Sequence, residues 1–448
     1  MSLKKMGLSQ QSHTQKDPLL GRVIERLKIT SMFRKGTGGN KGFDPFTISW
    51  EDEGKALGEF SLFIKKELYP VLGPLFKVGT FAAYKEEAIL DVLIYMAING
   101  VTSENGARTF KEEYKRECPS PRTIRYRLGK MEFSEVVSAF LEANKKLLSY
   151  FKKQKKFNVP VLLPIDPTHI PCYGKRKKYA CGMKRKRGTN YGYKNAACAV
   201  SAAGARVTLH TVFMTEFDTN PEMLEKLIEE ARKYVEIEAV LLDREFFNEP
   251  CIKKLEELTV KYVMPAKKIR KEFLHSLRPP CKGEVPLGSL HVPVIALKNP
   301  RDPKKTLYYS TNISIPDKSL GKVINVYRNR WTIENAFKSE KLVFLAKTYS
   351  VNPVIRFFFW ALSNVLYNAW ILCNVCAYKG LGLDPAKQKR PLITAFRFGI
   401  HMKTTFLSPL FSDDGPEELL QIALALVRHY LLQNSTQEIV IPHSMVPT

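Results

Sequence analysis

Cysteine is scarce in this sequence, with eight residues among 448 positions. So few cysteines in so long a chain do not indicate a disulfide framework, which excludes the small secreted scaffolds that depend on one. Two pairs stand out, Cys172/Cys181 and Cys373/Cys376. Neither has the second Cys or His pair that a structural zinc site requires. We therefore expect buried thiols in a reducing cytosol.

An apolar leader is also lacking. The stretch MSLKKMGLSQQSHTQKD has no apolar signal core, so we do not expect secretion. One apolar run, 354–377, has the length of a membrane span. It contains Arg356, Asn364, Asn368 and Asn374, which are costly in hydrocarbon, so we interpret it as a buried helix of a soluble domain. Internal repeats and low-complexity tracts are absent, which excludes repeat architectures.

Acidic residues are outnumbered. The sequence has 44 Asp and Glu against 70 Lys and Arg, a formal net charge of +26 and a pI near 9.6. Such an excess attracts polyanions, and nucleic acid is the commonest partner of a basic soluble protein. The alternative is a ribosome-associated or merely basic protein. At 44% hydrophobic residues, the length suggests two to four domains with sizeable cores.

The N-terminal third is predicted to be helical. After a flexible basic tail (1–45, with a short helix at 19–29), a helical region spans 46–155 and includes helices at 84–99, 105–114 and 119–131. Ser120 is the expected N-cap of the third helix. Arg122 and Arg125 would be exposed on it, as on the DNA-reading element of a helix-turn-helix. An ordinary helical bundle with a basic face is the alternative.

The periodicity changes after Phe157 and predicts alternating strands and helices. The expected strands are 159–166, 193–202, 205–214, 237–243 and 261–266, with helices at 220–235 (capped by Asn220) and 249–258. A meander followed by strand–helix alternation indicates an α/β fold, a mixed sheet flanked by helices. We divide the remaining chain into a first core part (156–266), a β-rich insertion (267–316), a second core part (317–380) with a long helix at 317–347, and a C-terminal helical region (381–448) with an amphipathic helix at 416–432.

Two aspartates end predicted strands: Asp166 after VPVLLPI and Asp243 after IEAVLL. The carboxyl ends of strands are where α/β sheets place their ligands. Paired carboxylates at such an edge suit Mg²⁺, and two ions about 3.5 to 4 Å apart can stabilise the entering and leaving oxygens of a phosphodiester.

The segment VYRNRWTIENAFKSEK (326–341) carries the most specific pattern. Tyr327, Arg330, Glu334 and Lys341 are separated by three, four and seven residues. At about 100° per residue they fall on one stripe about 60° wide beside an apolar stripe. The helix would thus present a carboxylate flanked by two cations and a phenol, which suits a phosphodiester.

A basic stretch follows the first aspartate. GKRKKYACGMKRKRGTNYGYK (174–194) has no acidic residue and contains Lys184, Arg185 and Arg187 with interleaved tyrosines. We interpret it as a loop that contacts the DNA backbone. A solvated basic loop is the alternative.

These motifs together resemble the insertion-sequence DDE transposases of the subgroup marked by Y-x2-R-x3-E-x6-K. Tyr327, Arg330, Glu334 and Lys341 match that spacing without a gap, and PIDPTHIPCYGK and LLDREFF resemble the family's two aspartate motifs. The resemblance covers about residues 157–375. It implies an RNase H-like catalytic core and a cut-and-paste transposase.

The resemblance also implies residue roles. Asp166, Asp243 and Glu334 would be the catalytic and metal-binding triad for two Mg²⁺ ions, with Mn²⁺ as a substitute. Tyr327, Arg330 and Lys341 would contact phosphates of the transposon end. Trp331 would stack on an unpaired base, and Arg244 is a further expected DNA contact. The expected partners are double-stranded terminal inverted repeats and target DNA, with a homodimer in the synaptic complex and no membrane. A prokaryotic, cytoplasmic and nucleoid-associated endonuclease is the expectation.

Alternatives remain at this stage. Glu245 and Glu340 are carboxylates that can be mistaken for triad members, and His169 is expected to be structural. The chain could be an RNase H-like nuclease without strand transfer, or a domesticated or inactive transposase that acts only as a sequence-specific DNA-binding protein. Loss of a triad carboxylate would favour the latter, but all three are present.

Overall fold

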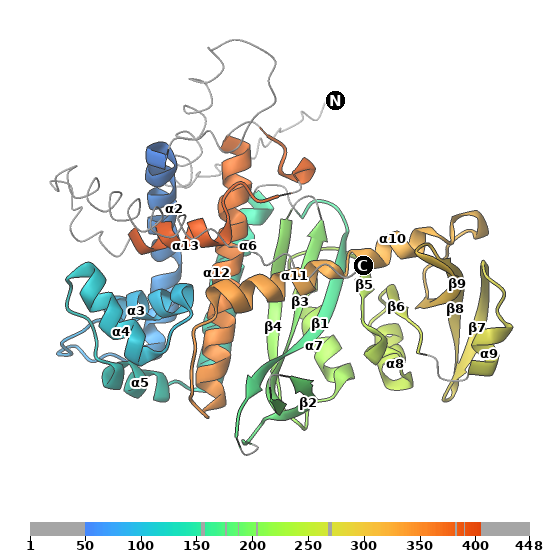
Figure 1. Ribbon diagram of the computed structural model, residues 1–448, viewed down its shortest axis with the longest axis horizontal. Helices are drawn as coiled ribbons and strands as arrows, with labels where there is room; N and C mark the ends of the chain where they lie inside the picture. The colour runs from blue at the N-terminus through green and yellow to red at the C-terminus, as the bar shows by residue number, and fades with distance from the viewer. Residues whose placement is uncertain are drawn as a thin grey trace, which may run out of the picture.

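The computed structural model describes residues 50–153, 157–174, 177–186, 188–202, 205–267, 271–380, 383–388 and 390–404. A helical region lies at one end, the main sheet in the middle and a smaller β-rich part at the other end (Figure 1). Several predictions fall outside the described residues: the basic tail 1–45 with its helix, the helix 416–432, and Arg187.

The region before the sheet is helical, as predicted. Its elements are α2 (Trp50–Leu72), the 3₁₀ helix η2 (Gly73–Phe76), α3 (Glu86–Asn99), α4 (Ser103–Tyr114), α5 (Pro121–Gly129) and α6 (Phe133–Lys153). Ser120 caps α5, because its Oγ accepts from the Thr123 amide at 3.2 Å. The following Pro121 suits the first helical position. The predicted start of the third helix is thus confirmed.

The main sheet mixes antiparallel and parallel strands. Its core strands are β1 (Val161–Cys172), β3 (Thr189–Ala202), β4 (Ala205–Met214), β5 (Ile237–Leu241) and β6 (Tyr262–Pro265). The spatial order is β4-β3-β1-β5-β6, with antiparallel pairing from β4 to β1 and parallel pairing from β1 to β6. The predicted mixed sheet is therefore confirmed.

The basic stretch 174–194 is not a loop throughout, so that prediction was wrong. Residues Cys181–Lys186 form β2, which pairs antiparallel with β3 up to Lys186 and Thr189. Gly188 in the turn has φ of 85°, a backbone conformation that favours glycine. This segment has only a weak apolar pattern, but it forms a strand because β3, already part of the sheet, offers hydrogen-bond partners.

The predicted β-rich insertion is present and extends the sheet. It contains α9 (Lys271–Ser276), β7 (Cys281–Leu287), β8 (Leu290–Asn299) and β9 (Asp302–Thr311). Strand β9 pairs antiparallel with β6, so that β7, β8 and β9 continue the same nine-stranded sheet.

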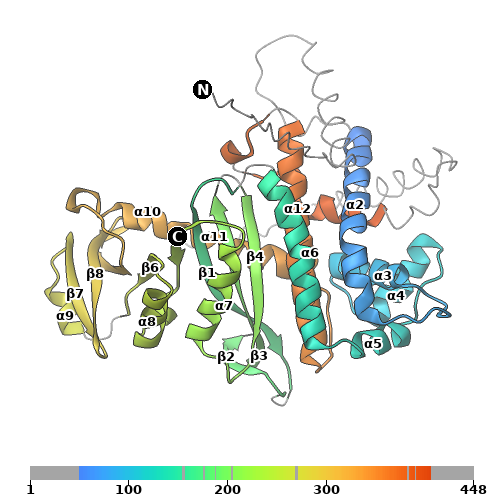
Figure 2. The same cartoon turned by 180° about the vertical axis from the view of Figure 1, so that it is seen from behind.

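Helices cover both faces of the sheet. Helix α7 (Asn220–Arg232) lies on one face, with η3 (Arg244–Phe246) and α8 (Glu249–Glu257) nearby, and α6 and α12 flank β4 (Figure 2). The N-cap of α7 is Thr219 rather than Asn220. Thr219 and Glu222 form a capping box, and this reciprocal pair places the helix start one residue earlier in the chain than predicted.

The predicted single helix 317–347 is broken into pieces. These are η4 (Asp317–Ser319), α10 (Lys322–Arg328), α11 (Trp331–Ser339) and the π-helical turn η5 (Glu340–Phe344). At the break after α10, the Asn329 side chain donates to the carbonyls of Asn325 and Val326. Such local side-chain bonds compete with the helical ladder. The prediction of one continuous helix was therefore wrong.

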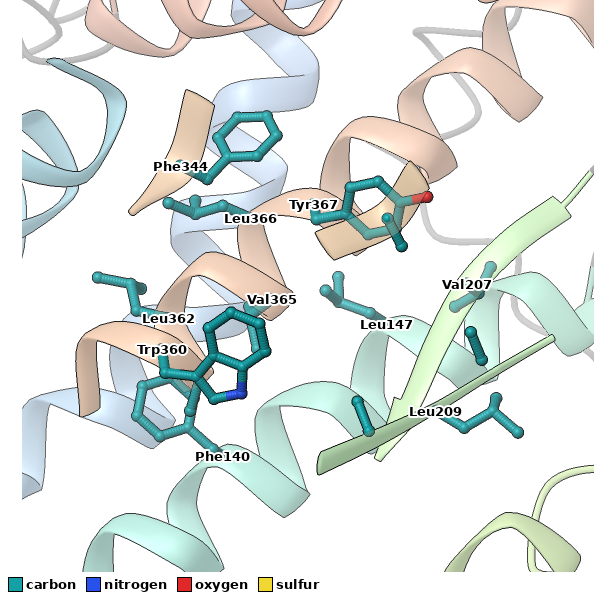
Figure 3. Packing of buried hydrophobic residues seen from close by; sticks show 14 of the residues in the cluster. Phe140, Leu147, Val207, Leu209, Phe344, Trp360, Leu362, Val365, Leu366 and Tyr367 are labelled. Atoms are coloured by element: carbon teal, nitrogen blue, oxygen red, sulfur yellow. The ribbon is translucent and has the colours of Figure 1, made fainter. Parts of the chain in front are cut away.

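Helix α12 (Pro353–Gly380) is the central helix of the core. It is long and apolar enough to span a membrane, but 78% of its most apolar window is buried inside the protein. Its side chains fill the space against α6 and β4, with Trp360 and Leu366 among those at the centre (Figure 3). This burial supports the interpretation as a core helix. The short η6 (Pro385–Lys387) and α13 (Ala395–Thr404) follow.

Candidate active site

Asp166 lies within β1 rather than at its end, which corrects the predicted strand boundary. Parallel pairing with β5 stops at Pro164, opposite Leu241, while pairing with β3 continues to Cys172. Beyond Pro164 the strand is paired on one side only, and such a strand tolerates Pro167 and Pro171. Asp166 therefore lies at the point where the β5 neighbour has ended.

Asp243 comes two residues after β5, close to the same edge. Its Oδ1 accepts from the Arg244 amide at 2.6 Å and caps η3. Because β1 and β5 are parallel, both aspartates lie at one end of the sheet. The cap leaves the other carboxylate oxygen for a ligand.

Arg330 joins β1 to α11. Its Nη1 lies 3.7 Å from the Asp166 carboxylate, and its Nη2 forms an ion pair with Glu334 one turn later on α11. The Arg330 side chain is 11% exposed, that of Asp166 18% and that of Glu334 40%. The first aspartate and the glutamate thus face the same guanidinium from two separate elements.

The electrostatics of Asp166 reflect this crowding. Burial raises the pKa of its carboxyl to about 7, Arg330 opposes the shift, and the carboxylates of Asp243, Glu334 and Glu245 add to it. The carboxylates that contribute to the raised pKa of Asp166 form an anionic site that a cation would stabilise.

The aromatic ring of Tyr327 contacts the Arg330 guanidinium. The Arg330 guanidinium lies 5.6 Å from the centre of the Tyr327 ring, within the range of a cation–π contact. The ring of Tyr309 on β9 packs against Tyr327 at 5.2 Å. Burial raises the pKa of Tyr327 to about 12, so its hydroxyl stays protonated.

Lys341 lies in the π turn and reaches back to β1. Its ammonium donates to the Thr168 hydroxyl and to the His169 carbonyl at 3.2 Å. Burial, together with Lys186, lowers the pKa of Lys341 to about 8. The break after α10 and the π turn mean that the four signature residues do not lie on one regular helix, yet all four lie near β1 or its neighbours.

The chemistry of these residues decides whether they suit a divalent metal. Among the residues that the structure describes, no three His, Cys, Asp or Glu side chains converge closely enough to hold an ion. Instead, the Arg330 guanidinium lies between Asp166 and Glu334 as a cation. Hard carboxylate oxygens are the ligand type that Mg²⁺ prefers, so Asp166 and Glu334 match this ion in ligand chemistry, although the described carboxylates do not converge on one point in this structure.

Other predicted DNA contacts surround this site. Trp331, at the start of α11, is 62% exposed. Arg244 is exposed beside Asp243, and Lys184 and Arg185 are exposed on β2. Tyr193, in contrast, is fully buried, and its hydroxyl donates to the Val351 carbonyl at 3.2 Å. The proposal that it belongs to a DNA-contacting loop is therefore wrong, since Tyr193 is part of the core.

The basic face of α5 lies apart from these residues, in the helical region. Arg122 and Arg125 are exposed, and Arg125 pairs with Glu104 of α4. Neither arginine contacts the carboxylates of the sheet in the described structure.

One site residue escaped the sequence interpretation. Thr168 follows Asp166 by two residues in β1 and therefore lies on the same face, where it accepts the Lys341 ammonium. The alternation D-x-T within an extended segment is the signal that could have identified it. His169 contributes its carbonyl, while burial lowers the pKa of its imidazole to about 4 and keeps the ring neutral.

Comparisons with known proteins concern the segment that carries these residues. Residues 158–369 match the family model described as Transposase DDE domain. Among solved structures, the chain is similar to a piggyBac transposase in a synaptic complex with hairpin DNA, at 12% identity and a TM-score of 0.50, over 83% of this chain and 84% of that one. No curated protein matches the sequence. The structural likeness concerns the fold, which is RNase H-like. The matched segment contains Asp166, Asp243, Glu334 and Lys341. Residues 158–369 of this chain are therefore similar to the DDE domain of transposases.

Proposed function

We propose that this chain cuts the ends of a mobile DNA element and joins them to target DNA, by cut-and-paste transposition. The observation that supports it is the meeting of Asp166, Glu334 and Arg330 from β1 and α11, with Asp243 close enough to raise the pKa of Asp166. The assignment to the Y-x2-R-x3-E-x6-K subgroup is part of the proposal and rests on the spacing of its four residues.

Asp166, Asp243 and Glu334 would hold two Mg²⁺ ions, or Mn²⁺ in their place. Ions bound there would stabilise the entering and leaving oxygens of a phosphodiester. The two aspartates lie at the carboxyl end of the parallel strands and are held in place there. Strand pairing fixes β1, and the Arg244 amide fixes the Asp243 carboxylate.

The remaining signature residues would hold the DNA strand. The Arg330 Nε is buried and has no hydrogen-bond partner among the described residues, so it can donate to a phosphate oxygen. Tyr327 keeps the guanidinium plane in place by ring contact. Lys341 adds a point charge, and the exposed Trp331 offers a ring on which an unpaired base can stack.

End recognition belongs, in this proposal, to the helical region. Arg122 and Arg125 on α5 would contact the terminal inverted repeat, while Arg244, Lys184, Arg185 and Arg187 would contact DNA near the cleavage site. In Arg122→Ala and Arg125→Ala variants, we expect weaker binding of the element's end and unchanged metal binding. Unaltered DNA affinity in both variants would remove α5 from the interface.

Two DNA ends must be brought together before joining, so we propose at least a homodimer in the active complex. Double-stranded ends and target DNA are the partners, and the chain would act in the cytoplasm of a prokaryote, on the nucleoid. The net charge of +26 supports binding to such a polyanion.

Cleavage of the DNA that flanks the protein's own gene tests the proposal. Wild type is compared with Glu334→Gln, which keeps the side-chain shape and removes the charge, in the presence of Mg²⁺ or Mn²⁺. We expect metal-dependent cuts at the element's boundary that disappear in the variant. Glu245→Gln, an exposed neighbour of Asp243, is the matched control and should still cut.

Each outcome is decisive. Cleavage that survives Glu334→Gln would mean that another carboxylate completes the triad. DNA binding without cleavage by either protein would favour the alternative, a domesticated or inactive transposase that acts only as a sequence-specific DNA-binding protein.

A further inference from the structure

The π turn η5 holds two neighbouring charged residues that face different strands. Lys341 bonds to Thr168 and His169 on β1, as described above. Glu340 is fully buried on the other side, and its Oε1 accepts from the Thr208 hydroxyl of β4 at 2.9 Å. One short turn thus connects the catalytic strand with the opposite edge of the core sheet. Single π turns of this kind are frequent at functional sites.

Thr208 is held in a rigid part of β4. The register with β3 shifts so that Cys198 faces His210 while Ala199 faces Thr208, which leaves Leu209 as the extra residue of a bulge. Asn368 of α12 bonds to both the amide and the carbonyl of Thr208, at 3.0 and 2.7 Å. The bulge is therefore a fixed anchor for whatever contacts Thr208.

Asn144 of α6 strengthens the same anchor. Its amide nitrogen donates to the Leu209 carbonyl at 2.6 Å, and its oxygen accepts from Asn368 at 2.7 Å. Side chains of β4, α6 and α12 surround this point (Figure 3). Hydrogen bonds between buried groups in a connected network resist displacement more than isolated ones do.

Glu340 is suited to this place only as an uncharged acid. Its Oε2 is buried without a hydrogen-bond partner among the residues described. Burial raises the pKa of the carboxyl to about 8, although the Thr208 bond and Lys341 oppose the shift. The ionisable groups that face it are Lys341 on its own turn and Tyr367 on α12, and Arg206 of β4 acts on Tyr367. The Lys341 ammonium is directed to β1 instead.

We propose that Glu340 is a positioning residue for Lys341: its hydrogen bond with Thr208 ties the π turn to the β4 bulge and so directs Lys341 toward β1. That Lys341 contacts DNA rests on the proposed function, whereas the tie between Glu340 and Thr208 does not. Glu340, the carboxylate next to Lys341 in the sequence, thus has a role other than metal binding in this proposal.

Hydrogen exchange of the full chain without DNA tests the tie directly. Glu340→Ala and Thr208→Val should accelerate amide exchange in residues 336–346 by about tenfold, since the turn loses its anchor. Glu340→Gln keeps an uncharged acceptor and should exchange like wild type. Thr211→Val is the matched control, because Thr211 lies on the same strand but bonds to Ala196 and Trp360. Equal exchange in Glu340→Ala and wild type, or equal acceleration by Gln and Ala, would overturn the proposal.

A double-mutant cycle on DNA affinity tests the action through Lys341. Glu340→Ala should weaken binding by about fivefold in wild type and by less than about twofold when Lys341→Ala is already present. Equal losses in both backgrounds would show a merely structural role and contradict the proposal. If Lys341→Ala alone leaves affinity unchanged, the proposed DNA contact fails, while the exchange result still decides on the tie.

The pH dependence of stability gives a third measurement. In the folded state the Glu340 carboxyl keeps its proton up to about pH 8, whereas in the unfolded state it loses the proton near its ordinary pKa. Its contribution to stability is therefore lost as the pH rises between these two values. The free energy of unfolding of Glu340→Gln should therefore increase relative to wild type between about pH 5 and 8. Lys341, whose pKa is about 8, titrates mainly at the upper end of this range. A difference that is independent of pH would mean that Glu340 is already charged.

Discussion

The Arg330 guanidinium lies 3.7 Å from the Asp166 carboxylate, and at the same time pairs with Glu334. The two carboxylates assigned to the metals are thus bridged by a cation of the protein itself. The carboxylates of Asp166 and Glu334 repel each other, so the guanidinium between them stabilises the site without metal. Divalent ions bound as proposed would compete with Arg330 for the same oxygens, and their binding would free the guanidinium for a phosphate.

This competition predicts the effect of removing the arginine. Arg330→Ala should bind Mn²⁺ more tightly than wild type in the absence of DNA, by about three- to tenfold, because the ion no longer displaces a guanidinium. Titration calorimetry with Mn²⁺ alone measures it. Arg244→Ala, an exposed arginine beside Asp243, serves as control and should match wild type. Weaker Mn²⁺ binding by Arg330→Ala would show that the arginine organises the carboxylates rather than competing.

Metal should also stabilise the fold through Asp166. An ion that binds only the folded state, and is present at a concentration of 100 times its Kd, raises the free energy of unfolding by about 2.7 kcal/mol. Thermal unfolding with and without Mn²⁺ should show this increase in wild type and in Glu245→Gln, and lose most of it in Asp166→Asn. An undiminished increase in Asp166→Asn would place the ion elsewhere in the protein.

The exposed cations of β2 should contribute to DNA affinity without sequence preference. Log affinity falls with log salt, and each lost phosphate contact makes this slope shallower by about 0.9. Lys184→Ala with Arg185→Ala should therefore make it shallower by about 1.8. Lys226→Ala with Lys233→Ala, on α7 and at its C-cap, removes the same charge away from β2. Equal slopes for both pairs would indicate a net-charge effect only.

Acid should destabilise the protein through a buried histidine. Burial in α13 lowers the pKa of His401 to about 4, whereas an unfolded histidine titrates near 6.5. The unfolded state therefore takes up the proton first, and stability decreases as pH falls from about 6.5 to 4. Urea unfolding over this range should show a shallower decrease in His401→Gln. An identical pH slope in both proteins would contradict the assignment.

Much of the fold could be predicted because its signals are local. The apolar runs before Asp166 and Asp243 correspond to β1 and β5, and the helical periodicity of the sequence predicted α3, α4, α5, α7 and α8. The convergence of the two aspartates follows from parallel pairing, which strand–helix–strand order favours.

What escaped prediction depends on non-local contacts. Strand β2 exists because β3 offers a partner, and β1 continues past Pro167 because its β5 neighbour has already ended. At the helix break, the Asn329 side chain bonds to carbonyls of the preceding turn, Asn325 and Val326. The position of Arg330 between two carboxylates depends on a rotamer, which spacing along a helix does not specify.

The burial of α12 has a consequence for dissecting this protein. The matched segment ends at residue 369, inside α12, and that helix packs against α6 from the N-terminal side. One cluster of buried hydrophobic residues runs from Phe60 to Met402 and includes Leu147 and Leu366. A fragment trimmed to the homologous segment would be cut through its own centre and would expose that cluster to water. Testing the helical region separately from the matched segment therefore requires substitution of surface residues in the intact chain, because one hydrophobic core joins the two parts.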